Sequence, residues 1–149
     1  MRPTKEMAEK LNELLEKNYD SEKGFLTAAD AVKNERLISF FKEKAQQRYN
    51  FGHELKAEIR TFGEEPEKGS SMKSGIHRAW MDLKSALNTD REEAVLEEVI
   101  KGEKAAVAEY NEIIRDDGFP PSTSNLLIKQ RNAIETTLKE VKDLEDIYD

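Results

Sequence analysis

Polar residues stand at four positions where the apolar stripes of long helical segments call for leucine, and they are the main candidates for chemistry. They are Glu22, Arg48, Glu103 and Gln130, one near the middle of each long segment. Burying one ionised group without a partner costs several kcal/mol, so four such groups at similar depth are expected to contact each other or to hold something. Carboxylates and amides at one level of a helical bundle could bind a metal ion. A guanidinium among them could instead neutralise the carboxylates through hydrogen bonds.

The two histidines, His53 and His77, are weaker candidates. His53 adjoins Glu54 and lies about one position off the apolar stripe, which favours a solvated helix surface. His77 lies close to Trp80 in the segment between the two halves of the chain, so these residues could contact the bundle or a partner protein. Neither histidine has a second ligand at metal-binding spacing, and the absence of cysteine excludes disulfides, thiol catalysis and thiolate metal sites.

Composition sets the class of the protein. The 149 residues suffice for one domain with a real core, and 37% of them are charged while 7% are aromatic. A net charge of −7 argues against nucleic acid and against anionic membrane surfaces as partners. Nowhere do ~18 apolar residues follow one another, and the N-terminal segment lacks the apolar run of an export signal. We therefore expect a soluble, cytoplasmic protein.

Helix caps and breakers divide the chain into five expected helices. Thr4 is expected to cap the first helix and Asn34 the second, and Gly63 suits the left-handed residue that follows the second. Residues 89–93 contain the S/T/D-x-x-E pattern of a capping box in two overlapping registers. Apolar residues nowhere alternate with polar ones as in a strand. The expected helices cover residues 4–33, 35–62, 71–88, 90–116 and 124–147.

Four of these helices are long, and their connections predict the fold. Short links join the first two and the last two, which makes each pair antiparallel neighbours. A crossover of about 26 residues, carrying the short helix at 71–88, joins the pairs. This is the connectivity of the ferritin-like four-helix bundles, so we predict an all-α antiparallel bundle with one long crossover.

Four stretches of the sequence resemble a bacterial group of small ferritin-like bundle proteins of unknown function. They are LNELLEKNYDSEKGF, KEKAQQRYNFGHEL, HRAWMDLKSAL and EEVIKGEKAAVAEY, and the resemblance covers nearly the whole chain. In plan it is similar to the rubrerythrin and ferritin superfamily, where two single glutamates and two Glu-x-x-His pairs hold di-iron or di-manganese. The resemblance implies that Glu22 and Glu103 stand where the two single carboxylates would be.

The other half of that ligand set is missing. In the second helix Gln47 or Arg48 takes the glutamate place, and Asn50 or Phe51 takes the histidine place. In the last helix Gln130 and Ala133, or their neighbours, replace the second pair. Such a site has lost two carboxylates and two imidazoles and has gained a fixed positive charge.

We therefore predict that Arg48 substitutes for the metal, with its donors bonded to Glu22 and to Glu103 and with Gln130 completing the hydrogen bonds. Two alternatives stay open at this point. Glu22 and Glu103 could bind iron or manganese in a centre with unusual ligands. The helical register could instead be shifted, so that these groups face solvent.

Three classes of function remain compatible with the sequence. The first is a non-catalytic structural, stress-related or interaction module without a cofactor, which could self-associate through apolar surroundings at residues 24–25 and 119–121. The second is a metal-binding or oxidase-type bundle, which only the fold resemblance and the two glutamates favour. The third is a bundle whose polar layer orients a small molecule.

Overall fold

The computed structural model describes residues 3–67, 92–115 and 118–148. The described residues form four long helices and contain no strand: α1 (Pro3–Ala31), α2 (Glu35–Thr61), α5 (Glu92–Ile114) and α6 (Pro121–Tyr148). The predicted all-α four-helix bundle is confirmed. The expected short helix at 71–88 lies outside the described residues, and so do His77 and Trp80.

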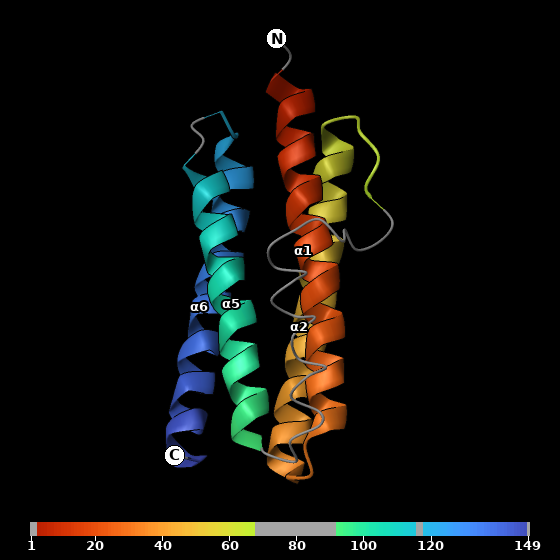
Figure 1. The fold of residues 1–149 in the computed structure, drawn as a ribbon. Coiled ribbons are helices and arrows are strands. Elements are labelled where there is room, and N and C mark those ends of the chain that lie inside the picture. The colour runs from red at the N-terminus through yellow and green to blue at the C-terminus, as the bar shows by residue number, and fades with distance from the viewer. Residues whose placement is uncertain (1–2, 68–91, 116–117, 149) are drawn as a thin grey trace.

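The four helices have the directions expected for two antiparallel pairs joined by one long crossover (Figure 1). From the N-terminus α1 descends and α2 ascends beside it, then α5 ascends and α6 descends beside α5. The end of α2 and the start of α5 therefore lie at opposite ends of the bundle. The two antiparallel pairs meet mainly through α1 and α5, whereas α2 and α6 contact each other sparsely.

Local sequence signals explain most of the helix ends. Asn34 caps α2 as predicted, because its side-chain oxygen accepts hydrogen bonds from the backbone N–H groups of Arg36 and Leu37. Gly63 follows α2 with a φ of 79°, which the absence of a side chain permits. Thr4 lies inside α1 rather than at its cap, since the helix already begins at Pro3.

The last helix begins earlier than we expected. Helix α6 starts at Pro121 and not near Ser124, and the carbonyl oxygen of Pro120 accepts the N–H of Ser124 at 3.0 Å. Proline is suited to the first helical position because its missing N–H would have no helical partner there. The turn-forming prolines thus belong to the helix start.

A single carboxylate ties α5 to the opposite pair of helices. The Oε2 atom of Glu92 accepts the backbone N–H groups of Lys33 and Asn34, both at 2.9 Å. These donors belong to the turn between α1 and α2. Glu92 therefore fixes the start of α5 against that turn, three helical turns before Glu103.

The core is a continuous apolar interior built from all four helices. Phe25 is 0% exposed and Phe119 is 7% exposed, so these two side chains belong to this interior and not to the self-association surface that we expected there, whereas Pro120 and Pro121 are exposed. The largest fully buried apolar side chains are Leu11, Leu14, Leu15, Phe25, Phe41, Leu55, Ile59, Leu96 and Tyr110.

None of the described helices has the length and apolar character that crossing a membrane would require.

Candidate functional site

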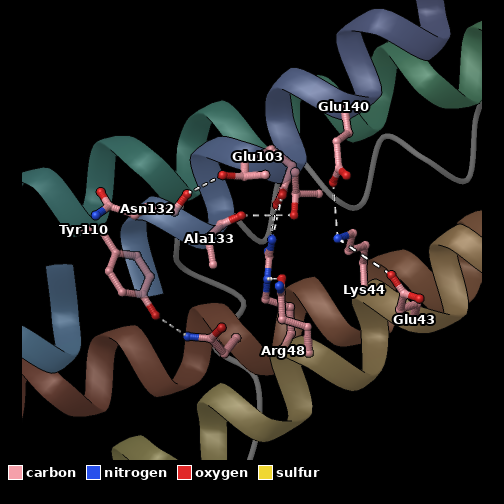
Figure 2. A network of polar contacts seen from close by, with 12 residues as sticks. Glu43, Lys44, Arg48, Glu103, Tyr110, Asn132, Ala133 and Glu140 are labelled. Carbon is pink, nitrogen blue, oxygen red and sulfur yellow. Dashed lines mark hydrogen bonds and ion pairs between the residues drawn. The ribbon is translucent and has the colours of Figure 1, made fainter. Parts of the chain in front are cut away.

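Arg48 and Glu103 form a fully buried ion pair in the middle of the bundle (Figure 2). The guanidinium extends from α2, and its Nη1 and Nη2 atoms donate to Oε1 and Oε2 of Glu103 on α5 at 2.7 and 2.6 Å. Both side chains are 0% exposed. Two parallel charge-assisted hydrogen bonds are the strongest arrangement that these groups can make. Both oxygens of the carboxylate are thereby engaged by the cation.

Two aromatic rings lie close to the guanidinium. The Cζ atom of Arg48 lies 5.2 Å from the ring centroid of Phe25 and 5.9 Å from that of Phe51. Its Nε donates to Oε1 of Gln47 at 3.2 Å. The ring faces attract the cation, so the arginine is held by an anion, an amide and two rings instead of water.

A second polar contact chain takes one side chain from each helix. The Tyr110 hydroxyl on α5 accepts from Asn18 Nδ2 on α1 at 2.9 Å and donates to Gln130 Oε1 on α6 at 2.7 Å. Gln130 Nε2 then donates to Glu54 Oε1 on α2 at 2.9 Å and to the carbonyl oxygen of Phe51 at 3.3 Å. We call Asn18, Tyr110, Gln130 and Glu54 the four-helix chain. It links all four helices without using a bound group.

Burial keeps the tyrosine of this chain neutral. It raises the pKa of Tyr110 above its usual value of 10.0, although the hydrogen bond from Asn18 and the positive charge of Arg48 act in the opposite direction. A neutral phenol can both accept and donate one hydrogen bond, as it does here. The hydroxyl is therefore a fixed bridge between two amides across the physiological pH range.

Lys44 makes a third contact between helices, closer to the surface. Its Nζ atom lies 3.2 Å from Oε1 of Glu140 on α6 and 3.9 Å from Oε1 of Glu43, as Figure 2 shows. The lysine side chain is 12% exposed. Nearby on α6, Ala133 stands at the position that we compared with a histidine ligand. Its carbonyl oxygen accepts the hydroxyl of Thr137 at 3.1 Å.

Glu22 does not lie where we expected it. Both terminal nitrogens of Arg48 bond to Glu103, and Glu22 is a half-exposed residue whose charged neighbours are Lys23, Lys56 and His53. Ser21, which is 1% exposed, occupies the inward position beside it. One residue corresponds to 100° of helix rotation, so Glu22 turns away from the bundle interior. Asn18, one turn earlier, is the polar residue that α1 contributes.

The remaining candidate on α2 is a surface residue. His53 is exposed, and its ring meets that of the exposed Tyr49 edge-on at a centroid distance of 4.5 Å. This agrees with the solvated helix surface that the sequence favoured.

Arg48, Glu103 and the four-helix chain, which together we call the polar layer, do not fit a di-metal centre. Arg48 places a fixed positive charge against the only carboxylate that is fully buried among them, and no imidazole from the described helices is buried. Such centres need several anionic oxygens together with imidazole nitrogens. A different group of carboxylates, Glu93, Glu97 and Glu145, brings its oxygens within 4.8 Å of one another, but these residues are exposed or half-exposed.

Sequence reasoning missed three members of the polar layer. Asn18 and Tyr110 stood in the stripes but were not chosen as site residues, and Glu54 was noticed only as a neighbour of His53. A phenol hydroxyl in a buried stripe needs a hydrogen-bonding partner, and this requirement could have singled out Tyr110. The stripe offers no comparable signal for Glu54.

We predict that Arg48→Ala lowers the free energy of unfolding by roughly 3–5 kcal/mol, because it strands the buried carboxylate of Glu103. Urea denaturation of the variant and of the wild type measures the difference. The double variant Arg48→Met/Glu103→Leu is the control, and its loss should be smaller because it leaves no uncompensated charge. A loss below ~0.5 kcal/mol in Arg48→Ala would mean that water solvates the guanidinium.

Glu22→Gln is expected to stabilise the protein slightly at pH 7. Burial is the main cause that raises the pKa of this carboxyl, so its ionisation at neutral pH disfavours the folded state. The stabilising gain should shrink as the pH falls through the raised pKa and vanish below the unfolded-state pKa. Urea titrations at several pH values test this. Clear destabilisation at pH 7 would mean that Glu22 has a cationic partner in the folded state.

Tyr110→Phe should lower the free energy of unfolding by about 1–3 kcal/mol, because it leaves the buried Oε1 of Gln130 without its donor. The ring is retained, so the loss reports on the hydroxyl. The surface substitution Tyr49→Phe is the matched control and should be neutral. Equal stability of Tyr110→Phe and wild type would contradict the four-helix chain.

Two solved structures share this fold over nearly their whole length. A mutant of Dps1 from Mycobacterium smegmatis matches with a TM-score of 0.76 and 16% identity, covering 96% of this chain and 97% of that one. The bacterioferritin-related protein from Bacteroides fragilis, described as a dodecameric thioferritin, matches with a TM-score of 0.73 and 15% identity, covering 97% of this chain and 87% of that one. At these identities the likeness shows the fold, which is ferritin-like.

The sequence itself gives one assignment. No curated protein matches it with statistical significance. The profile of the family described as Domain of unknown function (DUF2383) matches residues 6–116, which includes the two helices that carry Arg48 and Glu103. The chain therefore belongs to the DUF2383 family and is a ferritin-like four-helix bundle.

Proposed function

We propose that this protein is a non-catalytic ferritin-like bundle, a structural, stress-related or interaction module that needs no metal cofactor. The observation that carries the proposal is the pairing of both Arg48 donors with both Glu103 oxygens at 2.6 and 2.7 Å in the fully buried layer. The guanidinium provides the positive charge that a metal ion would otherwise supply.

Electrostatic repulsion favours this proposal over a metal centre at the position of the Arg48–Glu103 pair. A divalent ion about 4 Å from a guanidinium is opposed by about 8 kcal/mol at an effective dielectric constant of ~20. Glu103 could bind the ion only by giving up two charge-assisted hydrogen bonds. The four-helix chain, whose members are two amides, a phenol and one half-buried carboxylate, offers little compensation.

The surfaces support an interaction role better than small-molecule binding. Three grooves formed by described residues have side chains such as Phe40 and Leu144, or Tyr19 and Lys56, in their linings, and these three linings do not include Arg48, Glu103, Tyr110 or Gln130. A ligand in these grooves would not meet the polar layer. The Bacteroides fragilis protein is described as dodecameric, and we extend the proposal to self-association of this chain.

We expect protein purified without chelator to contain far less than one iron or manganese ion per chain, and anaerobic titration with Fe²⁺ or Mn²⁺ to show no stoichiometric buried site. Elemental analysis and calorimetry measure this. Ferroxidase activity should also be absent, because the layer lacks the ligands that hold two iron ions.

The variants Glu103→Gln and Glu97→Gln locate any metal that does bind. One or two ions per chain that disappear in Glu103→Gln or in Glu22→Gln would overturn the proposal, because these are the glutamates of the alternative metal centre. Binding that is lost only in Glu97→Gln would come from the surface carboxylate group and would agree with a metal-free interior.

A further inference from the structure

An apolar groove opens where the start of α2 and the end of α6 separate. Two adjoining depressions of about 430 and 300 Å³ share Phe40, Leu144 and Ile147, and Leu37 lines the larger one. We call these four residues the α2–α6 groove. Leu37 is 2% exposed and Phe40 packs edge-on against the buried ring of Phe41 at 5.7 Å, so the groove floor continues the core.

One side chain stands out from this groove toward solvent. Ile147 is 76% exposed, the highest value among the exposed large apolar side chains of the described residues. Burial of an aliphatic side chain of this size is strongly favourable. The surface therefore combines a projecting apolar side chain with an apolar depression beside it.

The charges at the groove have opposite signs on its two walls. Arg36 lines it on the α2 side, and Glu140 and Asp143 line it on the α6 side. Glu140 already pairs with Lys44 at 3.2 Å, whereas Asp143 and its intrahelical partner Lys139 are 66% and 79% exposed. A partner that matches this surface must offer both an anion and a cation at corresponding places.

We propose that the α2–α6 groove is a self-association surface that binds the same groove of a second copy of this chain. In a two-fold contact each surface meets its own equivalent, so residue i contacts j while j contacts i. Ile147 of each copy would enter the groove of the other, and Arg36 of each would face Asp143 of the other. A second copy supplies the apolar side chain and both charges together, which a uniformly basic or acidic partner helix does not.

This inference gives a location to the self-association included in the proposed function, and it is independent of the metal question. Metal analysis and molecular mass are separate measurements. A metal-free protein that stays monomeric would overturn the groove contact and the self-association part of the proposed function, but not the metal-free role. A protein that associates through the groove and also holds buried iron would overturn only the proposed metal-free role.

The test is the mass of the full-length protein by light scattering and sedimentation equilibrium, from micromolar to sub-millimolar concentration. Ile147→Glu should raise the dissociation constant of the two-fold contact at least about 10-fold, because it removes one buried aliphatic side chain per copy. Leu26→Glu, which changes an exposed leucine on α1 that is 45% exposed, is the matched control and should leave the mass unchanged. Circular dichroism checks that both variants stay folded.

A charge exchange between Arg36 and Asp143 tests the proposed two-fold geometry. Arg36→Glu and Asp143→Arg should each weaken association, and the double variant Arg36→Glu/Asp143→Arg should restore it, because a two-fold contact would pair the exchanged charges again. A wild type that is monomeric throughout the concentration range would overturn the proposal. An assembly that Leu26→Glu weakens while Ile147→Glu leaves it intact would also overturn it.

Discussion

The fully buried salt bridge between Arg48 and Glu103 is the constraint on which the rest of the bundle depends. Each charge would be very costly to bury alone, and together they are tolerable only because both hydrogen bonds of the fork are made. The two residues lie on α2 and α5, which run in the same direction and are joined only through the long crossover. Correct pairing therefore fixes how far the second half of the bundle is displaced along the first. Glu92 fixes the same displacement at the start of α5, where its side chain accepts two backbone N–H groups of the α1–α2 turn.

The four-helix chain adds a constraint of a different kind. A buried ion pair can strengthen or weaken a fold compared with apolar packing. It specifies a single helix register only when other buried hydrogen bonds require the same register. Tyr110 makes such bonds, because its hydroxyl accepts from an amide in one half of the bundle and donates to an amide in the other half. A shift of one helical turn between the halves would break both the fork and the phenol bridge. The polar interior therefore specifies one arrangement of the helices, in a fold whose members can use the same place to bind metal.

The sequence predicted the helices and half of the polar layer because both depend on periodicity. Arg48, Glu103 and Gln130 each replace an apolar residue in a regular stripe, and each is at most 1% exposed. Periodicity could not separate Glu22 from Ser21, since adjacent residues differ by 100° and a stripe on a long helix is wide enough to include either. It also could not decide that Arg48 bonds to Glu103 and not to Glu22, because that choice depends on where α1 and α5 place the two carboxylates. Glu54 was missed for the same reason, as its role comes from Gln130 across the bundle.

The chemistry of the interior supports the proposal that this chain acts through its surface. A bundle that holds metal leaves carboxylates and imidazoles open to an incoming ion, whereas here the donors and acceptors of the central layer are bonded to each other. Among the described residues, the large apolar side chain with the highest exposed fraction is Ile147, which lines the α2–α6 groove. Exposed apolar surface next to mixed charges is typical of protein contacts. A guanidinium that takes the place of a metal ion leaves the interior closed, which is why we propose the α2–α6 groove, and not the central layer, as the place where this chain contacts a second copy.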